Sequence, residues 1–234
     1  LVMPFVVGLT VAELLAAAEG APLPLAPVTR IAQQVAHGLD DLHALAPAGG
    51  RVVHRDISPP NIMVGLDGRV RLLDFGITKT PDNVARTVTG ALKGKPGYMA
   101  PEQLRYGPPD PRSDLFALGV VLYELATSRR LYPTKGARVP GAVRILDEPP
   151  PDLGEVRADA PFELVELLFE LLAKEPEDRP PDAAAAAARL GAVAEVLEAD
   201  EEDEDTDEPR STVAVLLREH GGAKLAERLE LAAR

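Results

Sequence analysis

The chain contains no cysteine, so it cannot form a disulfide, and nothing in it indicates an oxidising compartment. It also lacks a long hydrophobic run, since its most apolar stretches, residues 1–9 and 115–125, are too short to span a bilayer. We find neither a signal-peptide pattern nor an internal repeat. These absences favour a cytoplasmic protein, with no membrane segment in this chain.

The net charge is −12, but it is distributed unevenly. Nine acidic residues and no basic residue lie within residues 198–208, which leaves a net charge of −3 for the rest of the chain. Such an acidic run predicts a solvated, disordered linker. The nearly neutral remainder argues mildly against nucleic-acid binding, and we expect no nucleic-acid partner.

Residues 54–61 read H-R-D-I-S-P-P-N and place Asp56 five residues before Asn61. Two short apolar segments follow, separated by a tight turn that contains Asp-Gly, and this pattern predicts a β-hairpin over residues 62–73. The hairpin would bring Asn61 beside Asp74, which follows its second strand. An amide and a carboxylate that converge in this way can hold a hard cation such as Mg²⁺ against a phosphate. Asp56 would then remain available to accept a proton from an attacking hydroxyl.

This arrangement resembles the catalytic and metal-binding loops of protein kinases, H-R-D-x-x-x-x-N followed by D-F-G. Residues 74–76 supply Asp-Phe-Gly, and residues 100–102 supply the family's Ala-Pro-Glu. Each motif alone would be weak, but all three occur in order and at the family's spacing. The resemblance extends over residues 1–188 and is strongest to bacterial, eukaryotic-like serine/threonine kinases. It implies an α+β, protein-kinase-like fold, namely a mainly α-helical C-lobe with short β-hairpins.

The resemblance implies ATP and Mg²⁺ as cofactors and a protein as substrate. Asp56 would orient the substrate hydroxyl, while Asn61 and Asp74 would bind the metal. Arg55 would pair with a phosphate on the activation loop. That loop spans residues 77–93, where Thr87 and Thr89 are the candidate phosphorylation sites, although unmodified threonines remain an alternative.

Residues 1–8 resemble the hinge that borders the adenine in kinases. On this alignment Met3 is the gatekeeper, the backbone of Val6 bonds the adenine edge, and Thr10 lies near the ribose. The resemblance also implies nucleotide contacts for Met63 and Asn61. Independently of it, Thr10 and Glu13 predict a capping box at the start of a helix.

Ser58 departs from the family pattern, because most serine/threonine kinases have a phosphate-contacting lysine at this position. The threonine that usually contacts this lysine is itself replaced by Lys95. We therefore hypothesise a swap, in which Lys95 supplies the charge that Ser58 lacks. A solvent-exposed Lys95 without a catalytic role is the alternative. The family pattern further implies that Asp114 anchors the catalytic loop and that Arg179 pairs with Glu102.

Hydrophobic periodicity predicts helices over residues 11–18, 28–45, 110–127, 142–146, 162–173 and 183–197. Ser113 is the predicted cap of the third of these, which is apolar all round and should be buried. We divide the chain into a kinase C-lobe (1–197), an acidic linker (198–210) and a C-terminal helical tail (211–234). The tail is either a docking helix or a weakly ordered segment, and we expect it and the linker to offer a surface to a partner.

The chain contains no glycine-rich loop, no V-A-x-K strand and no helix with the glutamate that pairs with it. These parts clamp the ATP phosphates in protein kinases, so we expect a truncated kinase that lacks the small β lobe and is inactive alone. The alternative is a non-catalytic, pseudokinase-like module for protein interaction. Tyrosine specificity is disfavoured, because residues 57–60 lack the Arg and Ala of that branch.

Overall fold

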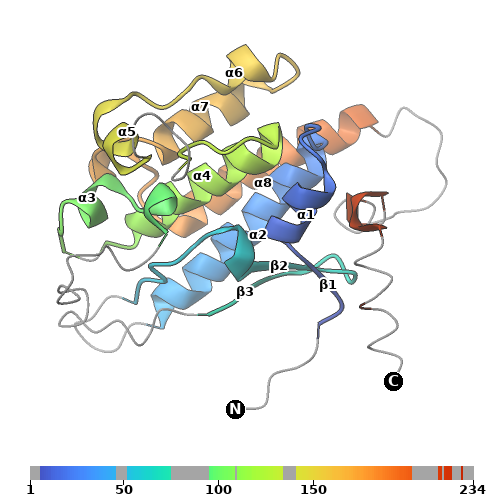
Figure 1. The fold of residues 1–234 in the computed structure, drawn as a ribbon, viewed down its shortest axis with the longest axis horizontal. Helices are drawn as coiled ribbons and strands as arrows, with labels where there is room; N and C mark the ends of the chain where they lie inside the picture. The colour runs from blue at the N-terminus through green and yellow to red at the C-terminus, as the bar shows by residue number, and fades with distance from the viewer. Residues whose placement is uncertain are drawn as a thin grey trace.

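The computed structural model describes residues 6–45, 52–74, 95–108, 110–133 and 141–201, together with residues 216–217, 219–222 and 228. Helices dominate this part of the chain, and one small sheet lies along one side (Figure 1). The predicted α+β, mainly helical lobe with short strands is therefore confirmed. Its helices are α1 (Val11–Ala17), α2 (Leu25–Ala44), α3 (Pro101–Leu104), α4 (Arg112–Thr127), α5 (Gly141–Asp147), α6 (Leu153–Val156), α7 (Phe162–Leu171) and α8 (Ala183–Glu201).

Helix α4 forms the centre of the lobe, between α2 and α8 on one side and α5 to α7 on the other (Figure 1). All its residues except Arg112 are buried, as its apolar sequence predicts. Gly119 allows close packing against α7, since a Cβ there would lie 2.9 Å from the Cβ of Leu171. The prediction that Ser113 caps this helix is wrong. The N-cap is Pro111, and the Ser113 hydroxyl instead donates to Glu102 (2.6 Å).

Helix α2 buries the predicted apolar stripe of Ile31, Val35, Leu39 and Leu42. It begins at Leu25, three residues earlier than the sequence pattern suggested. The reason is that Pro27 stands in the first turn, where a missing N–H removes no intrahelical hydrogen bond. The extra turn is buried and packs into the core.

The sheet has the order β1-β2-β3, with β1 (Gly8–Thr10), β2 (Ile62–Gly65) and β3 (Val70–Leu72) all antiparallel. The predicted hairpin is thus confirmed, and its tight turn includes Gly68 with φ of 73°. Beyond the last strand pair, the Leu73 N–H donates to the Asn61 carbonyl (2.8 Å). This bond fixes the chain directly before Asp74 against the end of the catalytic loop.

The predicted capping box at α1 is present. Thr10 accepts from the Glu13 N–H (3.2 Å), while its own N–H donates to the Glu13 carboxylate (2.8 Å). Helix α8 continues to Glu201, four residues past the predicted end. None of the helices in the described ranges is long and apolar enough to cross a membrane.

Candidate active site

The catalytic loop is fastened to α4 through Asp114, a carboxylate that is almost completely buried. Its two oxygens accept the backbone N–H groups of His54 (2.8 Å) and Arg55 (2.9 Å). A buried carboxylate persists only where it is hydrogen-bonded, and these two bonds set the position of the residues just before Asp56. The expected anchoring role of Asp114 is confirmed.

His43 is a third partner of Asp114 that the sequence did not identify. Its Nε2 lies 2.9 Å from Asp114 Oδ2, across 71 residues of sequence. Leu39, one helical turn earlier, lies on the same face of α2 and is buried. Periodicity therefore could have placed His43 on the inward side, but it could not have named the partner. The contact ties α2 to both the loop and α4.

Asp56 and Asn61 are held together at the centre of the loop. The Asn61 Nδ2 donates to the Asp56 carbonyl (2.8 Å) and to its Oδ2 (3.0 Å). Because the amide nitrogen is used in this way, the Asn61 Oδ1 remains as an oxygen donor, the type of ligand that Mg²⁺ prefers. The donor chemistry of Asn61 thus fits the predicted metal site.

Asp74 is exposed and follows the hairpin that Asn61 begins. Its backbone lies in the left-handed region with φ of 54°, and Arg55 has φ of 62°. Non-glycine residues rarely adopt this conformation, and where they do they cluster at functional sites. An exposed carboxylate here also fits a cation, since carboxylate oxygens are ligands that Mg²⁺ prefers. Phe75 and Gly76, and the loop threonines Thr87 and Thr89, lie outside the described residues.

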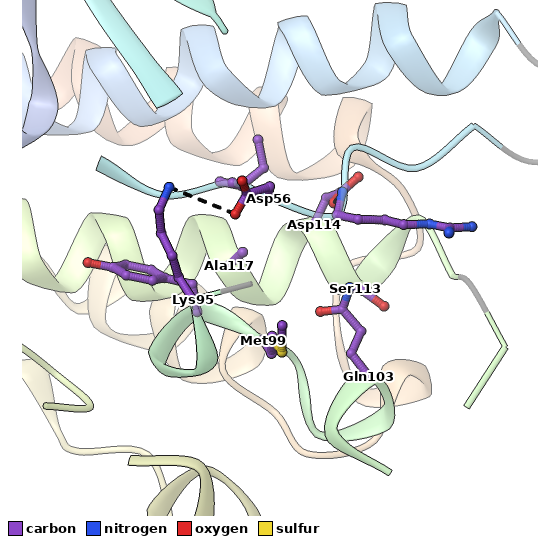
Figure 2. A pocket seen from close by; sticks show the side chains of 10 residues that line it. Asp56, Lys95, Met99, Gln103, Ser113, Asp114 and Ala117 are labelled. Atoms are coloured by element: carbon purple, nitrogen blue, oxygen red, sulfur yellow. Dashed lines mark hydrogen bonds and ion pairs between the residues drawn. The ribbon is translucent and has the colours of Figure 1, made fainter. Parts of the chain in front are cut away.

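Lys95 reaches the catalytic loop from the activation segment. Its Nζ donates to the Ser58 hydroxyl (2.7 Å) and lies 3.8 Å from Asp56 Oδ1. Figure 2 shows the lysine extended toward Asp56 beside α4, in a pocket that Arg55, Tyr98 and Met99 also line. The ammonium is partly exposed, so it remains accessible to a third group. The structure therefore brings Ser58 and Lys95 into contact. These are the two positions for which we hypothesised a swap.

Two of the predicted nucleotide residues, Thr10 and Met63, lie in the sheet. Val6 is half-buried, and Met3 lies outside the described residues. The hydroxyl of Thr10 donates to Glu13 (2.9 Å), so it serves the cap. Met63 lies in the middle strand and pairs with Thr10 in the register of β1 and β2. Two of these positions thus share one small surface.

The Ala-Pro-Glu glutamate is fixed by a buried guanidinium. Arg179 donates to both oxygens of Glu102, each at 2.8 Å, and its side chain is fully buried. Burial raises the pKa of Glu102, but the two Arg179 bonds and the Ser113 hydroxyl outweigh it, so the pKa is lowered overall. The predicted ion pair is confirmed, and it fastens the end of the activation segment.

Glu124 is a second buried carboxylate that the sequence did not single out. It accepts from the Tyr98 hydroxyl (2.8 Å), from Arg130 (3.1 Å) and from the Leu131 N–H (3.3 Å). Burial raises its pKa to about 8, although the Leu131 N–H works in the opposite direction. This carboxylate links α4 to Tyr98, two residues before the Ala-Pro-Glu motif.

Comparison with known proteins points to one family. Residues 1–189 match the model of the protein kinase domain. The chain is 42% identical to the tyrosine-protein kinase MasK of Myxococcus xanthus over 172 residues, 72% of this chain and 26% of that protein. It is 38% identical to the serine/threonine-protein kinase PknL of Mycobacterium tuberculosis over 197 residues, 84% of this chain and 47% of that protein.

The crystal structure of the M. tuberculosis PknI kinase domain has a similar fold, with a TM-score of 0.62 at 27% identity. That match covers 82% of this chain and 65% of the PknI chain. The chain therefore spans less than half the length of the two curated relatives, 26% of one and 47% of the other.

Proposed function

The chain belongs to the protein kinase family, and from this premise we propose that the intact protein transfers the γ-phosphoryl group of ATP to serine or threonine hydroxyls of protein substrates. The observation that carries the proposal is the geometry of Asp56. Its loop is anchored by Asp114, its Oδ2 accepts from Asn61, and its Oδ1 faces Lys95 at 3.8 Å. A carboxylate held in this way is partly exposed and can be reached by a hydroxyl.

In the proposed reaction, Asp56 orients the substrate hydroxyl and accepts its proton as the oxygen attacks the γ-phosphorus. The bond from that phosphorus to the bridging oxygen breaks, and ADP leaves. Such loops contribute mainly by positioning and by neutralising charge. Asn61 and Asp74 would hold Mg²⁺, which when bound neutralises charge on the phosphates. Arg55 would bind a phosphate on the activation loop, with Thr87 and Thr89 as its proposed sites.

We assign to Lys95 the contact with the transferred phosphoryl group. Two observations support this assignment, namely its 2.7 Å bond to Ser58 and its approach to Asp56. In this arrangement the positive charge comes from the activation segment rather than from the catalytic loop. The site would then acquire its full charge only when that segment is in place.

A charge-relocation experiment tests the role of Lys95. Lys95→Ala should lower kcat by about a hundredfold or more, because a charged contact made in the transition state is lost. Adding Ser58→Lys should restore much of the loss, since it returns a lysine to the catalytic loop. Lys95→Ala with unchanged turnover would reject the assignment. Failure of the rescue would show that the charge must come from the activation segment.

Phosphoryl transfer itself is tested with the longest open reading frame that contains this chain, purified and incubated with Mg²⁺, γ-labelled ATP and a general protein substrate such as casein. We expect label on the substrate, and none with Asp56→Asn. The 234-residue chain, assayed alongside, should transfer little label. If the longer protein binds ATP but transfers no label, it is a non-catalytic interaction module.

The acceptor residue is identified by hydrolysing the labelled substrate and separating its phosphoamino acids. We expect phosphoserine and phosphothreonine. The name of MasK makes phosphotyrosine the informative contrary result, because that relative is a tyrosine-protein kinase by name.

We also propose a cytoplasmic location, to be tested by cell fractionation, and a protein partner for the acidic linker and C-terminal helix.

A further inference from the structure

The C-terminal segment returns to the lobe. Leu216 and Leu217 are fully buried and belong to the same hydrophobic core as α1 and the sheet. In Figure 1 the helical turn that carries them lies on the side of the lobe where α1 and the sheet lie. Burying two leucine side chains is favourable enough to hold a tethered segment in place.

Arg228 contacts residues near the start of the chain, up to 220 positions away in the sequence. Its Nη1 donates to the Gly8 carbonyl (2.7 Å), and its Nη2 donates to Glu13 Oε1 (2.7 Å), 215 residues away. The same Nη1 lies 3.9 Å from the Met63 sulfur. Three elements, β1, α1 and β2, therefore converge on one guanidinium.

These partners belong to the surface that we propose for the nucleotide. Met63 is a proposed contact residue, and Glu13 uses its other oxygen, Oε2, to hold Thr10, which is another. Gly8 is the first residue of β1, the strand that follows the predicted hinge and ends at Thr10. On the proposed function, a guanidinium bonded to this surface would stand where the nucleoside binds.

We propose that the C-terminal segment is a ligand of this surface and that docking of Arg228 and nucleotide binding exclude each other. The inference rests on the proposed function, because it takes the sheet surface to be the nucleotide site. Docking is intramolecular, so the tether gives Arg228 a high effective concentration, on the order of millimolar. The ion pair is partly exposed, at 27% for Arg228 and 22% for Glu13, which keeps it weak enough for release.

Docking is tested in the 234-residue chain, whose lack of cysteine allows two to be introduced cleanly. Ala16→Cys lies one turn from Glu13 on an exposed part of α1, and Glu227→Cys precedes Arg228 in the sequence. A short bismaleimide should join the two within one chain. Adding Arg228→Ala should reduce the yield about fivefold, as expected when a charged hydrogen bond is lost. Adding Arg129→Ala, an exposed arginine of the same type, should not.

Competition is tested in the longer protein by titrating a fluorescent ADP analogue with Mg²⁺. Arg228→Ala should lower its Kd about tenfold, whereas Arg129→Ala should leave the Kd unchanged. Equal Kd values for wild type and Arg228→Ala would overturn the inference and leave the kinase proposal intact. Absence of nucleotide binding in every variant would overturn the proposed function and the competition together, even where the crosslink forms. A crosslink yield indifferent to Arg228→Ala would overturn docking, and with it the inference, while leaving the proposed function intact.

Discussion

Two ion pairs, Arg179–Glu102 and Lys95–Asp56, both fasten the activation segment, but they differ in burial and in geometry. In the first, the guanidinium side chain is 0% exposed and bonds both carboxylate oxygens at 2.8 Å. In the second, the side chains are 38% and 27% exposed and the charges lie 3.8 Å apart. The hydrogen-bonding groups of the first pair are occupied by other parts of the protein, whereas those of the second pair remain accessible to a substrate.

This difference in burial and geometry distinguishes an ion pair that supports the fold from one that is available for the proposed reaction. Arg179 also donates to the carbonyls of Arg112, Ala173 and Lys174, so its fork is saturated by the protein. Asp56 and Lys95 keep bonding capacity for a substrate hydroxyl and a phosphate. Pre-organised catalytic groups are expected to stand on such a support. Pairs of one basic and one acidic side chain thus stabilise the fold where the protein saturates their hydrogen bonds and serve the proposed reaction where it does not.

Arg179→Ala should destabilise the lobe more than any other substitution considered below. The substitution leaves the Glu102 carboxylate buried without its counter-charge and three backbone carbonyls without their donor. We expect a loss of about 3–5 kcal/mol in the free energy of unfolding, measured by urea denaturation of the 234-residue chain. Arg105→Ala removes an exposed pair with Glu175 and should cost less than about 0.5 kcal/mol. Similar losses for the two variants would contradict the distinction between the pairs.

Glu124 is a buried carboxylate whose cationic partner, Arg130, is exposed. The pH dependence of stability tests whether burial or pairing dominates at such a group. Its folded-state pKa of about 8 lies above the ordinary value of 4.5, so the folded state holds this proton to higher pH than the unfolded state does. Stability from this group is therefore complete below pH 4.5 and is lost as the pH rises toward 8. Tyr98 and Arg130 favour the charged form and reduce the loss. We expect about 2 kcal/mol in total.

The measurement is the unfolding free energy of wild type and Glu124→Gln from pH 5 to pH 8. Glutamine does not titrate, so the variant should lack this part of the decline. The difference between the two profiles isolates Glu124 from the histidines and other titrating groups. Parallel profiles would mean that Glu124 is charged throughout the range and is fully compensated by its neighbours.

Local features could be predicted from the sequence because neighbouring residues determine them. The hairpin between Asn61 and Asp74 follows from two apolar runs and an Asp-Gly turn, and the α1 cap follows from Thr10 and Glu13. The Glu102–Arg179 and Asp114 contacts were expected only through the resemblance to kinases. No spacing within this chain would have joined residues 77 positions apart.

Long-range polar partners could not be predicted, since they depend on how the helices pack. His43 could be placed on the inward face of α2 by periodicity, but its contact with Asp114 required the position of α4. Ser113 suggested a cap, yet the approach of Glu102 gave its hydroxyl a better acceptor. Arg228 is the extreme case, because its carboxylate partner lies in the first helix of the lobe.

Lys95→Ala distinguishes a catalytic role of the Lys95–Asp56 pair from a structural one, because its expected effects on stability and on turnover differ. The pair is partly exposed and its charges are not in direct contact, so we expect a change of less than about 1 kcal/mol in the unfolding free energy. Turnover, in contrast, should fall strongly, as proposed above. A stability loss close to that of Arg179→Ala would place Lys95 among the structural groups and remove the support for its catalytic assignment.

The smallest effect is expected at Asp67, on the exposed turn of the hairpin. Its hydrogen bond with Arg71 (2.6 Å) lowers its pKa to about 2, a shift that by itself would suggest a strong interaction. The side chains are 33% and 48% exposed, however, and solvent and salt screen such pairs. Its contribution is present above pH 3.8 and is lost as the pH falls toward 2.

Asp67→Asn tests this limit without disturbing the turn, because asparagine retains the oxygen that accepts from the Arg69 N–H. We expect a change in unfolding free energy of about 0.5 kcal/mol or less at neutral pH, decreasing further at high salt. A loss above about 1.5 kcal/mol, the range of charged hydrogen bonds, would show that exposure does not control the strength of the ion pairs in this lobe. The difference in stability between the Arg179–Glu102 and Lys95–Asp56 pairs would then need a cause other than exposure. The hydrogen bonds from the Arg179 guanidinium to backbone carbonyls would be the first cause to test.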